Sequence, residues 1–153
     1  MLALHKFNSA ERYIKEAMKT DSSAIELDFA TLNLALAQLR GEKWDTAMQT
    51  FESITRNFPN TPAANRATST LAYRSMRAFT VQTAAFSNQQ SAIREAERLK
   101  TRGANAFVFD IPDGRGGTIY TVCIGRYTNF RSAIMELERM RSRGLVTDAI
   151  IKP

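Results

Sequence analysis

The sequence predicts an α+β chain in two parts: an all-helical domain over residues 1–77 and a β-α-β-β-α-β domain over residues 78–153. The main observation is an internal repeat, because Phe79–Gly103 aligns with Tyr120–Gly144 at a constant offset of 41 residues without a gap. The two copies share 11 of 25 residues, and a repeat is stronger evidence of architecture than a single short motif. A second observation is that the apolar residues keep a helical spacing until the pattern changes near residue 78.

The N-terminal part begins with two predicted helices. Asn8 with Glu11 has the spacing of a capping box, and this predicts that the first helix starts there. Asp21-Ser22-Ser23 predicts a break before a second helix. The apolar residues of that helix recur at steps of four and three from Ile25 to Leu39, and Gly41 is expected to end it.

A third helix is predicted from Trp44 to just before Phe58-Pro59-Asn60, and a fourth with Thr61 as its cap and Pro62 in its first turn. The spacing Trp44-x-x-Ala47-x-x-x-Phe51-x-x-Ile54-x-x-x-x-Pro59 resembles the second helix of a tetratricopeptide repeat. The resemblance implies a TPR-like helical domain that contacts another protein through residues 1–77. A pair of helical hairpins that only pack together remains the alternative.

Each copy of the repeat in the second part contains the same succession of elements. An alternating apolar and polar run predicts a strand, an asparagine after Ser or Thr predicts a helix cap, and a glycine predicts the helix end. A second strand-like run follows each glycine. The strand, the cap, the glycine and the second run are Phe79–Thr83, Asn88, Gly103 and 104–111 in the first copy, and Tyr120–Ile124, Asn129, Gly144 and 145–151 in the second. Two such units predict a ferredoxin-like fold, with both helices on one face of a four-stranded antiparallel sheet.

Composition narrows the class of protein. An apolar fraction of 44% predicts a buried core, and a net charge of +6 permits an anionic partner without basic runs that demand nucleic acid. We expect no membrane span within the chain, and no signal peptide in its first residues. The protein is therefore either cytoplasmic, if the chain is complete as given, or exported by a segment outside this sequence.

Two strands of the second part resemble those of the SPOR domain family. Phe79-Thr80-Val81-Gln82-Thr83-Ala84-Ala85-Phe86 is similar to the opening strand, aromatic-x-Val-Gln-x-Gly-Ser-Phe. Tyr120-Thr121-Val122-Cys123-Ile124-Gly125-Arg126-Tyr127 is similar to the third strand, which usually ends in Val-Gly-Pro-Phe. The resemblance implies a non-catalytic domain that binds bacterial peptidoglycan, preferably glycan strands stripped of their stem peptides. It also implies a periplasmic or cell-envelope location and a role in cell division or wall remodelling.

Strand alternation predicts which side chains lie on the sheet face away from the helices. Aromatic rings cover the apolar faces of sugars, amide and hydroxyl groups bind their polar substituents, and arginine pairs with the lactyl carboxylate of muramic acid. The predicted glycan-binding residues are Thr80, Gln82, Ala85, Phe107, Phe109, Ile119, Thr121 and Arg126. The same alternation places Ala84 and Cys123 outward, and Arg115 in the Gly114–Gly117 loop is a second candidate for the carboxylate. Packing of Phe107 and Phe109 against the helical domain is the alternative.

Two rival functions belong to other classes. A β-α-β-β-α-β fold is also the architecture of the RRM, but an RRM carries stacking aromatics outward on its first and third strands. This chain is expected to have Thr80, Gln82, Thr121 and Cys123 there, so we expect no nucleic acid partner. The other rival is a protein–protein adaptor that acts through residues 1–77. We expect no catalytic group, metal site or cofactor, because Cys123 has no histidine near it in the sequence.

Overall fold

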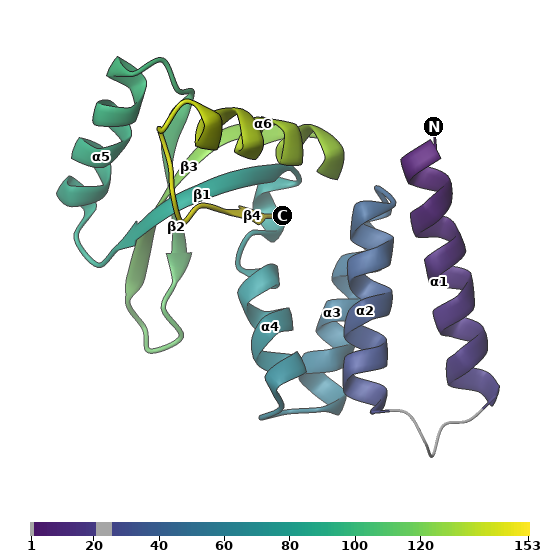
Figure 1. Cartoon of the computed structure of the whole chain (residues 1–153). Helices are drawn as coiled ribbons and strands as arrows, with labels where there is room; N and C mark the ends of the chain where they lie inside the picture. The colour runs from purple at the N-terminus through teal and green to yellow at the C-terminus, as the bar shows by residue number, and fades with distance from the viewer. Residues whose placement is uncertain (1, 21–25) are drawn as a thin grey trace. The chain divides into compact units, whose positions relative to one another are not determined.

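The computed structural model describes residues 2–20 and 26–153, with the side chains of the first range described from residue 6 onward. The chain divides into two compact units, Met1–Ser75 and Met76–Pro153 (Figure 1). The predicted break at Asp21-Ser22-Ser23, and Ile25 after it, lie outside the described residues.

The first unit consists of helices that pack in chain order. They are α1 (Leu2–Thr20), α2 (Leu27–Arg40), α3 (Trp44–Asn57) and α4 (Pro62–Leu71). Gly41 follows the last residue of α2, as predicted. The hydroxyl of Thr61 accepts a hydrogen bond from the Ala64 backbone N–H at 3.1 Å, which confirms the predicted cap of α4.

The predicted capping box at Asn8 is wrong, because α1 already begins at Leu2. Glu11 is instead buried, and its carboxylate forms ion pairs of 2.7 Å with Lys15 and 2.6 Å with Lys43. The side chain of Gln38 also donates to this carboxylate, at 3.3 Å. Burial opposes ionisation, but the hydrogen bonds from Lys15, Lys43 and Gln38 outweigh it and lower the pKa of Glu11 to about 2. Glu11 therefore connects α1 to α2 and to the residue before α3.

A short 3-10 turn, η1 (Arg74–Met76), covers the boundary between the two units in the sequence. The second unit has the predicted ferredoxin-like fold. Its elements are β1 (Phe79–Phe86), α5 (Gln89–Thr101), β2 (Ala106–Pro112), β3 (Thr118–Tyr127), α6 (Phe130–Ser142) and β4 (Ile150–Lys152). The strands lie in the order β2-β3-β1-β4, and every neighbouring pair is antiparallel. Figure 1 shows α5 and α6 on the same side of this sheet.

The repeat has the same helix ends in both copies. Asn88 accepts from the Ser91 N–H at 3.0 Å, and Asn129 accepts from the Ser132 N–H at 2.8 Å. Gly103 and Gly144 follow the two helices with φ of +85° and +61°, in the left-handed region that favours glycine. The predicted caps and helix ends are therefore confirmed.

The last strand is shorter than predicted, because only Ile150–Lys152 pairs with β1. Leu145, Val146 and Ala149 are buried in the core instead of extending the sheet. They belong to the same core cluster as Leu99 and Met140, which are buried residues of α5 and α6. Burial of apolar surface decided the course of this segment, and strand propensity did not.

Candidate functional site

Strand register defines the sheet face that lies away from the helices. One row across the sheet contains Phe107, Cys123, Gln82 and Ile150, each directly opposite the next. Phe109, Thr121 and Ala85 form the next row, and Ile111 and Ile119 pair beyond it. Opposite residues in an antiparallel pair lie on the same face of the sheet. These rows therefore form one surface, which we call the outer face.

The neighbours of these residues in the strands confirm which side they occupy. Ala106, Val122 and Ile124 belong to the core, and Val108 packs against it. Side chains alternate along a strand, so Phe107 and Phe109 lie on the opposite side, as predicted. Both rings are half-buried.

An irregularity in β3 turns Arg126 toward this outer face. Phe79 is paired with Tyr127 and Val81 with Ile124, so Gly125 and Arg126 both lie opposite Thr80. This is a β-bulge, and Gly125 within it has a φ of +66°. The ring of Tyr127 lies against Gly125 where a side chain would otherwise be. The guanidinium of exposed Arg126 is 4.8 Å from the centroid of the Phe107 ring, within cation–π distance.

A second irregularity, in β1, changes which alanine is exposed. Gln82 pairs with Cys123 and Ala84 with Val122, so Thr83 is an additional residue in β1. Ala84 consequently packs against the core and Ala85 is exposed. The outward position expected for Ala84 was wrong, because a bulge reverses the alternation after it.

The two threonines of the outer face are buried, so the exposure expected for them is also wrong. Thr80 is fully buried, and its hydroxyl donates to the Gly125 carbonyl at 2.7 Å, with the Ile124 carbonyl 3.2 Å away. The Thr121 hydroxyl donates to the Phe109 carbonyl at 2.6 Å. The hydrogen bond of Thr80 therefore stabilises the bulge that contains Arg126, and that of Thr121 links β3 to β2.

Cys123 is buried in the middle of the first row. Burial raises the pKa of its thiol, although hydrogen bonds with Thr121 and Thr80 and the charges of Arg126 and Lys152 act in the opposite direction. A buried thiol with a raised pKa is a poor nucleophile. The electrostatic influence of Arg126 and Lys152 also indicates that two positive charges lie close to this row.

Sequence reasoning missed two residues of the outer face, Ile150 and Lys152. They enter it through the pairing of Gln82 with Ile150 and of Thr80 with Lys152. No sequence signal identified them, because their place depends on where the short β4 pairs with β1. Ile150 is 50% exposed.

The structure does not bring Arg115 together with Arg126. Arg115 lies in the β2–β3 hairpin loop, where the Asp113 carboxylate accepts from the backbone N–H groups of Arg115 and Gly117 at 2.7 and 2.8 Å. That loop precedes Thr118, at the opposite end of β3 from Arg126. Thr118 and Arg126 are eight residues apart in β3, about 27 Å along the strand, so the two arginines lie at different ends of the sheet.

Residues 2–20 and 26–153 contain no group of three or more His, Cys, Asp or Glu side chains placed to hold a metal ion. None of the helices in this part of the chain has the length and apolar character needed to cross a bilayer.

The second unit is thus a ferredoxin-like domain with two helices on one sheet face and an aromatic and basic row on the other. The family model of the SPOR domain matches residues 75–152, and the chain belongs to the SPOR domain family. SPOR domains are peptidoglycan-binding domains, typical of the cell envelope, and their role is binding and not catalysis.

Among solved structures, the chain is similar to the crystal structure of the RlpA SPOR domain from Pseudomonas aeruginosa. The identity is 16% and the TM-score 0.39, over 49% of this chain and 97% of that one. No curated protein sequence matches the chain.

Proposed function

We propose that residues 76–153 bind peptidoglycan glycan strands along the outer face, with a preference for strands that have lost their stem peptides. The observation that carries the proposal is the juxtaposition of Phe107 and Arg126 beside Gln82 on a sheet face away from the helices. Membership of the SPOR family supports the same ligand.

The chemistry of this row fits a sugar polymer. Phe107 and Phe109 offer ring surface for the C–H faces of pyranose rings, and Gln82 offers amide groups for hydroxyl or N-acetyl substituents. A muramic acid without its stem peptide has a free lactyl carboxylate, which is a partner for the guanidinium of Arg126. Ala85 and Ile119 add apolar surface, while Thr80 and Thr121 act from beneath the face by holding its backbone.

This ligand implies a place of action in the periplasm or cell envelope. Stem peptides are removed where amidases cut the wall, and this occurs at division septa. We therefore also propose that the protein has a role in cell division or wall remodelling.

The experiment is cosedimentation of the purified chain with sacculi, untreated or pretreated with an amidase. We expect more binding to treated sacculi, and a loss of about tenfold or more for Phe107→Ala with Phe109→Ala, since aromatic anchors typically dominate such surfaces. Gln82→Ala is expected to weaken binding less. Met135→Ala is the matched control, because Met135 is 62% exposed on α6, which covers the other face of the sheet. Equal binding by all variants would contradict the proposed face.

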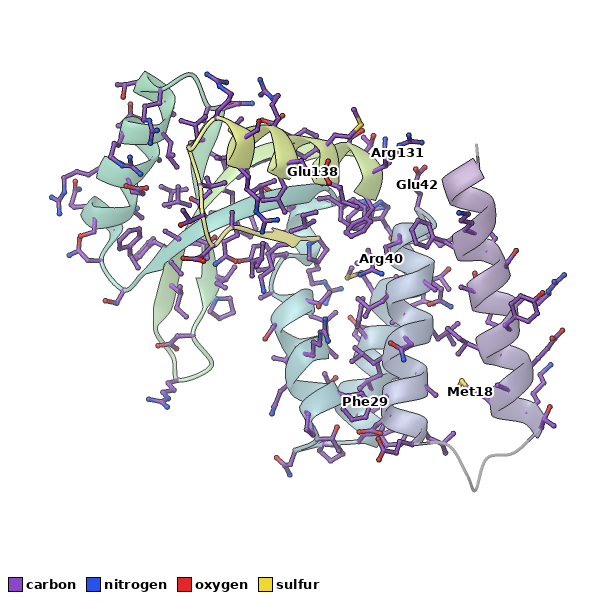
Figure 2. All side chains as sticks on the ribbon, viewed as in Figure 1. Met18, Phe29, Arg40, Glu42, Arg131 and Glu138 are labelled. Carbon is purple, nitrogen blue, oxygen red and sulfur yellow. The ribbon has the colours of Figure 1, made fainter. Side chains whose placement is uncertain are left out.

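The second candidate function is a protein adaptor that acts through the helical unit. A groove of about 370 Å³ lies between α1 and α2, and Ile14, Ala17, Met18, Phe29 and Ala30 contribute its apolar lining. Figure 2 labels Met18 and Phe29 on these two helices. Because Phe29 is 40% exposed, this groove offers apolar surface to an amphipathic segment of another protein.

The two functions are separable by variants of the full chain. If the chain is an adaptor, Met18→Ala with Phe29→Ala is expected to abolish its binding to the partner protein and to leave sacculus binding unchanged. A partner that still binds this variant as tightly as the unmodified chain would rule out the groove.

A further inference from the structure

The C-terminal ends of α5 and α6 meet at one corner of the second unit, and their arginines reach across to each other. The Arg102 guanidinium donates to the Gly144 carbonyl at 3.0 Å, and the Arg143 guanidinium donates to the Arg102 carbonyl at 3.4 Å. Arg141 donates to the Ala149 carbonyl at 3.2 Å. We call these three arginines the basic corner.

The positive charge of this part of the chain is concentrated on the two helices and the residues that end them. Residues 89–102 and 130–143 carry eight basic and four acidic side chains, whereas the remainder of residues 78–153 carries three of each. The strands and loops, which include Arg126 and Lys152 of the outer face, carry no net charge. The excess belongs to the opposite, helical layer.

Within that layer, carboxylates form ion pairs with some cations but, among the described residues, not with the three arginines of the basic corner. Arg98 pairs with Glu95 at 2.6 Å, Lys100 with Glu97 at 2.8 Å, and Arg139 with Glu136 at 2.7 Å. The hydrogen bonds of Arg102, Arg141 and Arg143 go to backbone carbonyls instead. The charge of Arg102 contributes to lowering the pKa of Glu95, but that carboxylate is already hydrogen-bonded to Arg98.

Hydrogen bonds to backbone carbonyls explain where these arginines lie, but they occupy only part of the hydrogen-bonding capacity of each guanidinium. A helix C-terminus carries partial negative charge and attracts cations. Each guanidinium has five N–H donors in a planar fork that fits phosphate oxygens, and only one donor per arginine is used here. The remaining donors of exposed Arg102 and Arg143 are therefore available to an anion.

The corner lacks the features of a protein interface. Such interfaces are usually anchored by apolar or aromatic side chains in a central pocket. The apolar residues nearest to the helix ends, Leu99, Met140, Leu145 and Val146, are all buried in the core. A cluster of cations without an apolar anchor favours a broad anionic surface over a protein partner.

We propose that the basic corner docks on the phosphate headgroups of an anionic phospholipid bilayer. The choice of a bilayer as the source of phosphate rests on the proposed cell-envelope location, where membrane lies next to peptidoglycan. The domain then contacts two components of the envelope through different sides: glycan through the outer face and lipid phosphate through the ends of α5 and α6.

The test is cosedimentation of the full chain with vesicles of phosphatidylglycerol and phosphatidylcholine, compared with vesicles of phosphatidylcholine alone. Binding is expected only to the anionic vesicles, and it is expected to fall as salt rises. Arg102→Gln with Arg143→Gln is expected to weaken binding about 30-fold, from roughly 1 kcal/mol for each arginine near such a surface. Arg102→Lys with Arg143→Lys keeps both charges and is expected to stay within about threefold of the unmodified chain.

The matched control is Arg94→Gln with Arg131→Gln, which removes the same charge from the same helices near their N-terminal ends. A loss equal to that of the Arg102 and Arg143 variant would overturn the assignment to this corner. Binding to soluble polyphosphate without binding to vesicles would overturn the bilayer as the partner. Sacculus binding is measured in parallel: if it persists while vesicles fail to bind, the lipid proposal alone is wrong.

Discussion

The two copies of the repeat have nearly the same helices but different strands. In both copies an asparagine caps the helix, a glutamate pairs with an arginine three residues later, and a glycine with positive φ follows the helix. All of these interactions are made within the helix or at its ends. Equivalent short sequences therefore produced equivalent local structure.

The strands diverge where they meet different neighbours. The position equivalent to Gly125 in the first copy is Ala84, and the position equivalent to Arg126 is Ala85. β3 has its bulge at Gly125 and Arg126, whereas β1 has its bulge at Thr83. Only the second copy presents a charged side chain beside Phe107. The two copies therefore share a scaffold but present different side chains on the outer face.

The largest expected effect comes from Gly125→Ala, which makes the second copy more like the first. A left-handed conformation costs an L residue about 1–2 kcal/mol, and the new methyl group would also meet the Tyr127 ring. We expect a total loss of about 3 kcal/mol in the free energy of unfolding. Native-state amide hydrogen exchange of β3 residues measures this change in the free energy of unfolding.

Gly116→Ala is the control for that substitution. Gly116 also has a positive φ, of +88°, but nothing lies within 4 Å of where its Cβ would be. Gly116→Ala is therefore expected to lower the free energy of unfolding by about 1 kcal/mol. Equal costs at the two glycines would show that Tyr127 does not constrain the bulge.

The next effect concerns the charge that only the second copy carries. Arg126→Ala is expected to reduce binding to amidase-treated sacculi about tenfold, as expected for the loss of one charge-assisted hydrogen bond. Arg126→Lys should recover part of this affinity, because it restores the charge without the planar fork. Arg94→Ala on α5 serves as the control, and an equal loss there would indicate a general charge effect.

The helix caps test whether the copies are energetically equivalent. Asn88→Ala and Asn129→Ala are each expected to lower the free energy of unfolding by about 1 kcal/mol, because each removes one side-chain acceptor from a helix start. Thermal unfolding of the two variants under identical conditions measures the costs. A large difference between them would show that tertiary contacts fix one helix start without its cap.

The smallest expected effect concerns the exposed ion pairs. A hydrogen bond from Arg98, which outweighs burial, lowers the pKa of Glu95 below its ordinary value of 4.5. The stabilisation from this pair is therefore present above pH 4.5 and disappears as the pH falls through the lowered pKa. An NMR titration of the Glu95 carboxyl is expected to show this lowered pKa, and Arg98→Gln should raise it again. Glu95→Gln should change stability less than either cap variant, since exposed pairs contribute little.

Residues with local roles were predicted correctly. Asn88 and Asn129 cap helices, Gly103 and Gly144 follow them, and Thr61 caps α4, because each interaction involves atoms within a few residues along the chain. The facing of Phe107 and Phe109 also followed from alternation, because β2 pairs with β3 without a bulge. The error at Asn8 has the opposite cause. Its partner Glu11 bonds to Gln38 and Lys43, which are distant in sequence.

The sequence by itself determined the duplicated strand–helix unit, the ends of its helices and the fold that two such units form, since these depend on apolar periodicity and short-range hydrogen bonds. Tertiary structure alone decided the bulges that bury Ala84 and turn Arg126 toward Phe107, the short β4 that brings Lys152 to the outer face, and the meeting of Arg102 with Arg143. Register and bulges depend on which residues of distant strands lie opposite one another, and no local pattern specifies that.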